Sequence, residues 1–332
     1  MMGPSVRTTA AGGGTRMDAR IVVAGEALID LMVGDDPRHP TACPGGSPAN
    51  TAVALARLGE PVAFAGRFGD DRFGDMLLAN LSANDVDLGY AIEADEPASI
   101  AVVTTGTDRG ARYQFHVTGT ADWAWREHEL PTRLPDSVTA VHAGSLAMAL
   151  PPGADVLARW FADQRAHRVT SFDPNIRPAL VGPRERYVPW LESVVATSDV
   201  VKVSTEDLAW AYPDEDPERI VGNWHAELGV TLAVLTKGGS GATAIAAGRT
   251  ITRPATVVDV GDTVGAGDAF SAGLPHWLAE HDLLTQRGLA ALTDDDINAA
   301  LDYAAMVAGL ACGKHGADPP TREEVEAAFA AA

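Results

Sequence analysis

Short runs of consecutive apolar and β-branched residues recur along the chain, and each run ends in glycine or a small polar residue. Most of the segments between them have a helix-like composition. Strands that are apolar on both faces and alternate with helices are typical of a mostly parallel sheet covered on both sides. The predicted strands lie at residues 21–25, 62–66, 138–144, 169–173, 200–204 and 232–236. In such sheets ligands bind beyond the carboxyl ends of the strands, so we expect the functional residues where these runs stop.

Two segments break this pattern. Residues 31–44, LMVGDDPRHPTACP, are irregular and punctuated by proline. Residues 98–120 alternate between apolar and polar positions like a β-ribbon, with a turn predicted at 107–110. Together they predict a small antiparallel flap, or lid, beside the main sheet.

The segment 47–59 carries helix signals at both ends. Ser47 is predicted to cap the helix, Pro48 suits its first position and Gly59 is suited to close it. The buried flank of this helix is predicted to contain Val53, Ala56 and Leu58. Near the carboxyl terminus, Thr321 and Glu324 have the spacing of a capping box for a last helix.

The composition sets limits on partners and compartment. The chain has 332 residues, enough for one large α/β domain, and its net charge of −20 disfavours nucleic acid and anionic membranes as partners. The two cysteines, Cys43 and Cys312, have no metal-like spacing and suit a reducing compartment. Residues 1–19 lack the apolar centre of a signal peptide and are predicted to be a disordered tail. We therefore expect a cytoplasmic protein with no membrane span.

The stretch GDTVGAGDAF, residues 261–270, carries the strongest chemical signal. Gly265, Ala266 and Gly267 allow a ligand close to the backbone, and a helix is predicted to begin there. The free N–H groups and positive dipole end of a helix amino terminus bind phosphate. Asp268 in the first turn has two interpretations: it stabilises the helix, or it accepts a proton from a hydroxyl that attacks phosphorus. Pro275 falls inside this helix and is predicted to kink it or end it early.

Other phosphate-binding signatures are absent from the sequence. The chain has no G-x-x-x-x-G-K-[ST] motif, and its first strand continues into GEALID instead of the dinucleotide fingerprint G-x-G-x-x-G. The protein-kinase motifs are also missing. These absences disfavour a P-loop enzyme, a protein kinase and an NAD-dependent oxidoreductase.

DTVGAGDAF at 262–270 resembles the carboxy-terminal signature of the ribokinase-like, or PfkB, family of carbohydrate kinases. PGGSPANTAVALARLG at 44–59 resembles the sugar-binding signature near the amino terminus of that family. FDPNIRPAL at 172–180 and TKGGSG at 236–241 are similar to its internal landmarks, in the expected order. The resemblance covers residues 20–332. It implies a single ribokinase-like kinase domain with three α/β/α layers, a mostly parallel central sheet and a small antiparallel β lid at 31–44 and 98–120.

The resemblance also assigns roles to individual residues. It implies that Asp268 is the general base and that Gly265, Ala266 and Gly267 form the anion hole for the transferred phosphoryl group. Asp262 and Thr263 are expected to shape this loop, near which some relatives bind a monovalent cation. For the sugar, the resemblance implies contacts from Asp30, Gly45, Gly46 and Asn50, while Arg177 is expected to hold a substrate oxygen or a phosphate.

The nucleotide site follows from the same resemblance. Thr236, Gly238 and Gly241 match the T-x-G-x-x-G turn of the family and are expected to bind ATP, together with Ser204. The adenine is expected against Ala305, Ala308 and Cys312. The family often has N-x-x-E where this chain has Ser204 and Asp207, with Glu206 adjacent. Asp207 is therefore the candidate residue for Mg²⁺ and its waters.

The implied activity is transfer of the γ-phosphate of MgATP to a sugar hydroxyl. FDPNIR resembles the fructokinase and 2-keto-3-deoxygluconate kinase branch, and Val117 stands where a lid arginine is usual in that branch. A sugar acid would lack that cationic partner unless Arg112 or His116 supplies it, so fructose is the first choice. Trp123 and Trp125 are candidates for the pocket wall or for packing.

Several alternatives remain open from the sequence. They are a 2-keto-3-deoxygluconate, ribose or nucleoside kinase of the same fold, and a non-catalytic protein that senses a sugar or nucleotide. Relatives often dimerise by pairing their lid sheets, and the edge of the 98–120 ribbon is suited to such a homodimer.

Overall fold

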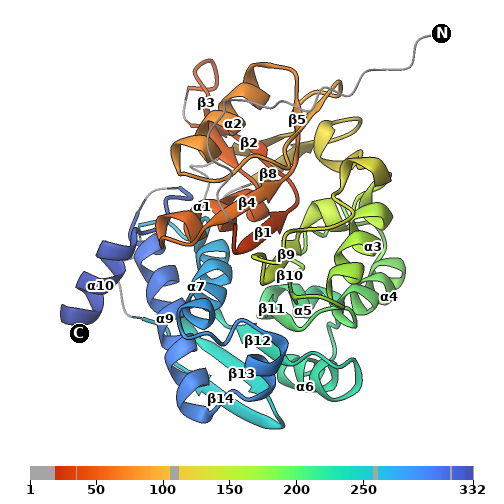
Figure 1. Cartoon of the computed structure of the whole chain (residues 1–332). Helices are drawn as coiled ribbons and strands as arrows, with labels where there is room; N and C mark the ends of the chain where they lie inside the picture. Colours follow the sequence, from red (N-terminus) through yellow and green to blue (C-terminus); the bar gives the residue numbers. More distant parts are fainter. Residues whose placement is uncertain (1–18, 35, 105–111, 257–260, 315, 332) are drawn as a thin grey trace.

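The computed structural model describes residues 19–34, 36–104, 112–256, 261–314 and 316–331 (Figure 1). The predicted tail lies outside these ranges except for Ala19, and so does the predicted turn at 107–110. Among the described residues, no helix combines the length and apolar character needed to cross a membrane. Both cysteines are free thiols.

The main sheet has eight strands in the order β14-β13-β12-β11-β10-β9-β1-β4. The strands from β4 to β12 in this order run parallel, and β13 and β14 add an antiparallel edge. The six predicted strands are confirmed, whereas the antiparallel edge was not predicted. Their bounds are β1 (Ile21–Ala24), β4 (Val62–Ala65), β9 (Ala140–Gly144), β10 (Val169–Asp173), β11 (Val200–Ser204), β12 (Leu232–Thr236), β13 (Ala242–Ala246) and β14 (Arg249–Arg253).

Helices cover both faces of this sheet, so the predicted three-layer α/β/α architecture is confirmed (Figure 1). One face carries α1 (Ser47–Arg57), α2 (Arg72–Ala83), α7 (Ala266–Glu280) and α9 (Asp294–Cys312). The other carries α3 (Ala154–Gln164), α4 (Arg184–Val195), α5 (Thr205–Ala211) and α6 (Pro217–Glu227). Successive residues of β1 point to opposite faces: Ile21 and Val23 enter one core, and Val22 and Ala24 enter the other. The described residues also contain the short helix α8 (Gln286–Ala290) and the helix α10 (Arg322–Ala331).

The lid is a separate four-stranded sheet in the order β3-β2-β7-β8, and β2 and β3 appear in red and orange in Figure 1. Its strands are β2 (Leu28–Val33), β3 (Thr41–Gly45), β7 (Ile100–Thr104) and β8 (Arg112–His116). The outer pairs are antiparallel, as predicted, but the central pair β2–β7 is parallel. Residues 31–44 were expected to be irregular, but both ends of this segment form strands: residues 31–33 belong to β2 and residues 41–44 to β3. Main-chain pairing with β2 holds even the proline-containing TACPG in a strand.

The remaining elements of the described residues are short. A two-stranded pair consists of β5 (Arg67–Gly69) and β6 (Ile92–Ala94). The short 3₁₀ helices are η1 (Ala121–Trp123), η2 (Glu127–Glu129), η3 (Leu146–Met148) and η4 (Gly238–Ser240).

Two local predictions about helix ends are wrong. Ser47 is the first residue of α1 and makes no capping hydrogen bond; the N-cap is Gly46, with φ of 101°. The side chain of Ser47 points to Asp268 instead. Of the two outcomes predicted for Pro275, an early end of α7 is wrong, since the helix continues to Glu280; residues 268–276 are all buried, and packing compensates for the missing N–H group. The predicted kink stays a prediction.

Two other end signals are confirmed. Gly59 follows the end of α1 with φ of 91°. The N–H of Thr321 donates to Glu324 Oε2 at 2.7 Å, and the N–H of Glu324 donates to Thr321 Oγ1 at 3.3 Å, which completes the predicted capping box.

Candidate active site

The amino terminus of α7 forms the predicted phosphate-binding loop. Gly265 is the N-cap in the left-handed conformation, with φ of 77°, and Ala266 is the first helical residue. The Asp262 carboxylate shapes the preceding turn by accepting the N–H of Val264 at 3.1 Å and the N–H of Gly316 at 3.0 Å. The first amides of α7 lack helical acceptors, so this end of the helix is suited to an anion.

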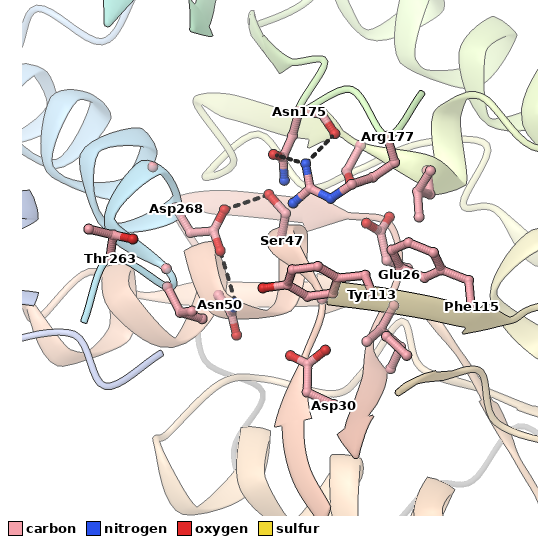
Figure 2. A pocket seen from close by; sticks show the side chains of 18 residues that line it. Glu26, Asp30, Ser47, Asn50, Tyr113, Phe115, Asn175, Arg177, Thr263 and Asp268 are labelled. Carbon is pink, nitrogen blue, oxygen red and sulfur yellow. Dashed lines mark hydrogen bonds between the residues drawn. The ribbon is translucent and has the colours of Figure 1, made fainter. Parts of the chain in front are cut away.

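Asp268 lies in the first turn of α7, and residues of α1 hold its carboxylate on both oxygens. Ser47 Oγ donates to Oδ1 at 2.6 Å, and Asn50 Nδ2 donates to Oδ2 at 2.9 Å (Figure 2). Burial raises the pKa of Asp268 above its usual value, while these two hydrogen bonds and the charge of Lys202 oppose the rise. The carboxylate therefore sits at the wall of a cavity, oriented and desolvated, as a general base requires.

A buried charged layer supports the loop from below. Lys202 Nζ lies 2.8 Å from Asp173 Oδ2, and Ser271 Oγ donates to the same oxygen at 2.9 Å. A Cβ at Gly267 would lie 3.1 Å from Lys202 Nζ, which places the ammonium group beside the phosphate-binding loop. Burial alone would lower the pKa of Lys202, but the Asp173 carboxylate raises it overall. The ammonium group of Lys202, paired with Asp173, therefore lies next to the predicted anion hole.

Sequence reasoning missed Lys202 and Asp173. The sequence contained a clue for both residues, because Lys202 lies inside a predicted buried strand and Asp173 ends another. A lone charge in a buried strand needs a partner, and strands β10 and β11 are neighbours.

A cavity of about 270 Å³ opens beside Asp268. Lid strands and main-sheet loops both line it, and Figure 2 shows Asp30 and Asp268 on the same cavity. Its lining brings together most of the predicted sugar and phosphate residues, namely Asp30, Gly46, Asn50, Arg177, Gly265, Gly267 and Asp268. This volume is just below the usual range for small-molecule sites, about 300–1,000 Å³, and is suited to a small ligand.

Asp30 projects into the cavity from β2. Burial raises its pKa to about 6, with the nearby Arg177 lowering it and Asp268 raising it. Gly45 lies on the paired strand β3, and a Cβ there would overlap Asp30 Oδ2, so Asp30 keeps this position only beside a glycine. At Gly46 the limit is the backbone, because a Cβ would lie 2.7 Å from the carbonyl oxygen of Glu26.

Arg177 reaches the cavity from the loop after β10. Its Nη1 donates to Asn175 Oδ1 at 2.7 Å and to the main-chain oxygens of Asn175 and Ile176 at 3.1 and 3.2 Å. Asn175 has φ of 38°, so a strained turn directs the guanidinium group. Among the described residues that line the cavity, Arg177 is the only arginine, and no lysine joins it.

The cavity also contains residues that the sequence analysis did not select. Ser145 follows β9 and Glu26 lies just beyond the end of β1. Tyr113 and Phe115 come from β8 (Figure 2). Burial raises the pKa of Glu26 to about 7, although hydrogen bonds from Ser145 and from the N–H of Ala147 oppose the rise. Glu26 follows a predicted strand directly, which is the position where functional residues were expected.

The lid residues proposed from the sequence lie elsewhere. Trp123 and Trp125 are both 3% exposed and belong to the core beside α3, so they pack and do not line the cavity. Val117 packs against the same core. Arg112 and His116 are exposed on β8, and neither lines the cavity. Relatives usually have an arginine at the position of Val117, and no cationic side chain of the described residues 112–117 lines the cavity in its place.

The predicted nucleotide residues form a second group at the same edge of the main sheet. Ser204 and Thr236 end the neighbouring strands β11 and β12 and pair directly. Gly238 begins an exposed 3₁₀ turn, and Gly241 has φ of 96° at a position where any Cβ would overlap the carbonyl oxygen of Arg253. Ala305, Ala308 and Cys312 lie on α9, and the carbonyl of Cys312 accepts the N–H groups of Gly261 and Asp262. The carboxyl end of α9 therefore adjoins the phosphate-binding loop.

Both carboxylate oxygens of Asp207 are engaged by the protein. Oδ1 accepts the N–H of Ile176 at 2.7 Å, and Oδ2 accepts Ser204 Oγ at 2.8 Å within the capping box of α5. Burial raises its pKa. Among the described residues, no three histidine, cysteine or acidic side chains group together as a metal site.

A doubly covered α/β sheet with a lid over a cavity that holds an oriented carboxylate and a helix amino terminus is the architecture of ribokinase-like sugar kinases. Residues 18–324 match the pfkB family carbohydrate kinases, and the chain belongs to this family. It is a sugar kinase, an enzyme that transfers a phosphoryl group to an alcohol.

Named relatives agree with this assignment. The chain is 37% identical over 279 residues to a fructokinase of Rhizobium leguminosarum bv. trifolii, covering 82% of this chain and 84% of the relative. It is 35% identical over 281 residues to a fructokinase of Klebsiella pneumoniae, covering 84% and 90%.

Solved structures extend the likeness to the whole fold. A fructokinase from Xylella fastidiosa with bound ATP superposes with a TM-score of 0.87 at 28% identity, covering 94% of this chain and 98% of that one. A double mutant of a Vibrio cholerae fructokinase, in a fructose, ADP and potassium ion bound form, gives a TM-score of 0.80 at 27% identity, covering 95% and 99%.

Proposed function

We propose that this sugar kinase is a fructokinase, which transfers the γ-phosphoryl group of MgATP to a hydroxyl group of fructose. The observation that carries the proposal is the placement of Asp268. Its carboxylate is fixed by Ser47 and Asn50, borders the cavity and lies within one helical turn of the amides at Gly265–Gly267. A base and an anion hole thus share one site.

The proposed reaction needs little beyond this arrangement. The sugar oxygen attacks the γ-phosphorus while Asp268 accepts the hydroxyl proton, and a new oxygen–phosphorus bond forms. The bond from the γ-phosphorus to the bridging oxygen breaks, and its electron pair leaves with ADP. The amides of Gly265, Ala266 and Gly267 stabilise the negative charge on the transferred group, with Lys202 close behind them.

Fructose is supported by the charge of the cavity and by the relatives. Glu26, Asp30 and Asp268 are acidic wall residues, and they face a single arginine, Arg177. A sugar acid would bring a further negative charge next to these carboxylates. The hydroxyl groups of a neutral ketose instead donate hydrogen bonds to the carboxylate oxygens. We propose that Asp30 and Asn50 bind these hydroxyls, that the backbone at Gly45 and Gly46 allows the sugar to approach, and that Arg177 holds a phosphate oxygen.

The nucleotide is proposed to lie along the ends of β11 and β12. Ser204, Thr236, Gly238 and Gly241 lie there, and adenine would contact Ala305, Ala308 and Cys312 on α9. Mg²⁺ usually keeps several waters and binds substrate phosphates with one or two carboxylates, so a dedicated cage is not required. The carboxylate of Asp207 is held by protein donors and fits a role through metal-bound waters, where the ion would neutralise phosphate charge. The loop at Asp262 is the proposed place of a monovalent cation, as the potassium-bound relative suggests.

The test is a coupled assay of ADP release with MgATP and one sugar at a time. Fructose should give the highest kcat/KM among fructose, ribose, 2-keto-3-deoxygluconate and adenosine. A higher kcat/KM with another member would replace fructose by that substrate. Absence of turnover with all four, together with measurable ATP binding, would contradict the fructokinase assignment and favour a sensing protein.

We further propose a homodimer formed through the lid. Strands β3 and β8 are the edges of the lid sheet, and an edge strand has unpaired main-chain groups that a second copy could bind. Sedimentation equilibrium should give twice the mass of one chain. A monomeric mass at micromolar concentration would contradict this proposal without affecting the kinase assignment.

A further inference from the structure

Asp122 is a buried carboxylate outside the cavity and outside the proposed chemistry. It lies in η1, directly after the lid, and is 1% exposed. Its Oδ1 accepts the N–H of Ala27 at 3.0 Å, and its Oδ2 accepts Ser99 Oγ at 2.5 Å. Both partners lie far from Asp122 in the sequence, and both directly precede lid strands, β2 and β7.

Within the described ranges, the chain passes between the main domain and the lid sheet at four places. The first three are 25–27 before β2, 45–46 after β3 and 97–99 before β7, and the fourth is 117–121 after β8. Asp122 joins three of these connections. It accepts hydrogen bonds from Ala27 in the first and Ser99 in the third, and it directly follows the fourth. The second connection contains Gly45 and Gly46, where an added Cβ would collide with Asp30 or with the carbonyl oxygen of Glu26.

Further contacts close this junction. Thr120 Oγ1 lies 2.6 Å from Ser99 Oγ and 3.0 Å from the carbonyl oxygen of Val117, and its single proton is donated to one of these two acceptors. The N–H of Ala121 donates to Pro97 O at 2.9 Å, and the N–H of Ile29 donates to Ser99 O at 3.0 Å. The carboxylate of Asp122 is thus the centre of a network that reaches three segments.

The charges around Asp122 show what holds it. Among the described residues, no lysine or arginine side chain forms an ion pair or hydrogen bond with its carboxylate; Arg67 instead donates to Ala121 O and pairs with Glu96 and Glu129. Burial raises the pKa of Asp122 to about 6, and the bonds from Ser99 and Ala27 oppose the rise. Its main anchors are therefore the hydrogen bonds from the lid junction.

We propose that Asp122 is a positioning residue that fixes the lid over the sugar cavity by tying three of its four connections together. This inference rests on the proposed function. Asp30 lies three residues after Ala27, and Ala101 lies two residues after Ser99, and both line the cavity. Release of the junction would move these wall residues relative to Asp268, which belongs to the main domain. The cost falls on sugar binding, while the nucleotide residues on β11 and β12 are unaffected.

The experiment compares Asp122→Ala and Asp122→Asn with a matched control, Asp199→Ala. Asp199 is also a buried aspartate, 3% exposed, and accepts the N–H of Thr170 and Nε of Arg165 at 3.0 Å each, but it lies at the amino ends of the main-sheet strands. Steady-state kinetics give KM for fructose, KM for ATP and kcat. Hydrogen–deuterium exchange compares lid peptides covering β2 and β7 with main-sheet peptides covering β9 and β10.

In Asp122→Ala, KM for fructose should rise about ten-fold or more, as expected for loss of a buried hydrogen-bond acceptor, while KM for ATP changes less than about two-fold. Exchange should accelerate in β2 and β7 but not in β9 and β10. Asp122→Asn keeps one acceptor oxygen and should recover part of the fructose affinity. Asp199→Ala should lower the melting temperature and leave KM for fructose unchanged.

Unchanged fructose KM and unchanged lid exchange in Asp122→Ala would overturn the proposal. So would an equal rise of fructose KM in Asp199→Ala, since that would reveal a general loss of stability. If Asp122→Ala does not fold, Asp122→Asn and Ser99→Ala give the same comparison, because Ser99→Ala removes only the donor. If the wild-type enzyme does not turn over fructose, the proposed function fails, and the exchange measurement still decides the role of Asp122.

Discussion

The carboxylate of Asp268 and the hydroxyl group of Ser47 are joined by a 2.6 Å hydrogen bond between residues that lie 221 positions apart. The bond connects the first turn of α7 to the first residue of α1. It brings the two separate signature segments of the sequence into one site. Each oxygen of the proposed base has a donor, so the side chain is fixed before substrate arrives.

Replacement of Asp268 by asparagine should abolish most of the activity. General-base catalysis contributes about 10²–10⁴-fold, so kcat should fall by at least about 10²-fold in Asp268→Asn. Calorimetric binding of ATP should remain close to wild type, because the nucleotide residues are on other elements. Retention of more than about a tenth of wild-type kcat would contradict the assignment of the base.

Removal of the Ser47 donor should change the pH dependence of the reaction. The hydrogen bond from Ser47 lowers the pKa of Asp268, so Ser47→Ala should raise that pKa further. The base must be ionised, and the acidic limb of kcat/KM should therefore move to higher pH. Ser193→Ala, which removes an exposed serine bonded to Trp190 O, is the matched control and should leave the profile in place. An unshifted acidic limb in Ser47→Ala would show that this contact does not tune the base.

A methyl group at position 45 should weaken sugar binding. The new Cβ would overlap Asp30 Oδ2, so Asp30 must move in Gly45→Ala. KM for fructose should rise about ten-fold or more with a smaller effect on KM for ATP. Gly34→Ala in the same lid is the control, because nothing lies within 4 Å of its Cβ position. Equal kinetics in both variants would argue against a sugar contact from Asp30.

Glu26 should make stability depend on pH. Its pKa is raised from 4.5 to about 7 in the folded protein, so the folded state favours the protonated form. Its contribution is present below about pH 4.5 and is lost as pH rises through 7, a loss of up to about 3 kcal/mol in the free energy of unfolding. In urea unfolding, the free energy of unfolding of wild type should fall between pH 5 and pH 8 by more than that of Glu26→Gln, because glutamine stays neutral at both pH values. The exposed Glu227→Gln should show no such difference, and equal behaviour of the two variants would contradict the prediction.

The sequence predicted most of the fold because the buried strands are nearly continuous apolar runs. Residues 169–173, 200–204 and 232–236 became β10, β11 and β12 without change of bounds. The lid was harder to predict, since TACPG contains a proline and its strand character comes from pairing with β2. The error at Pro275 has a similar origin, because the local cost of a proline was outweighed by burial of the surrounding helix.

The candidate site was predictable where a short motif contains the chemistry. Asp268 and the loop at 265–267 were selected from local spacing together with the resemblance to known kinases, and Asp30 and Asn50 from the resemblance; the structure places these residues beside one cavity, while their roles stay predictions. Contacts that depend on long-range folding were not found. Three such contacts join residues from separate segments of the chain: Ser47 with Asp268, Lys202 with Asp173, and Ala27 with Asp122. Trp123 and Trp125 were ambiguous because an aromatic residue near a lid serves equally well in a core.

The strand order has a consequence for how the enzyme is made. Strand β1 is made before both of its neighbours, β4 and β9, and the second of them is translated more than a hundred residues later. Helix α7, which carries Asp268, emerges later still and must then dock on α1. A nascent chain halted before α7 would contain the first signature without its catalytic partner. Enzymatic activity should therefore appear only after α7 has been made and has met α1.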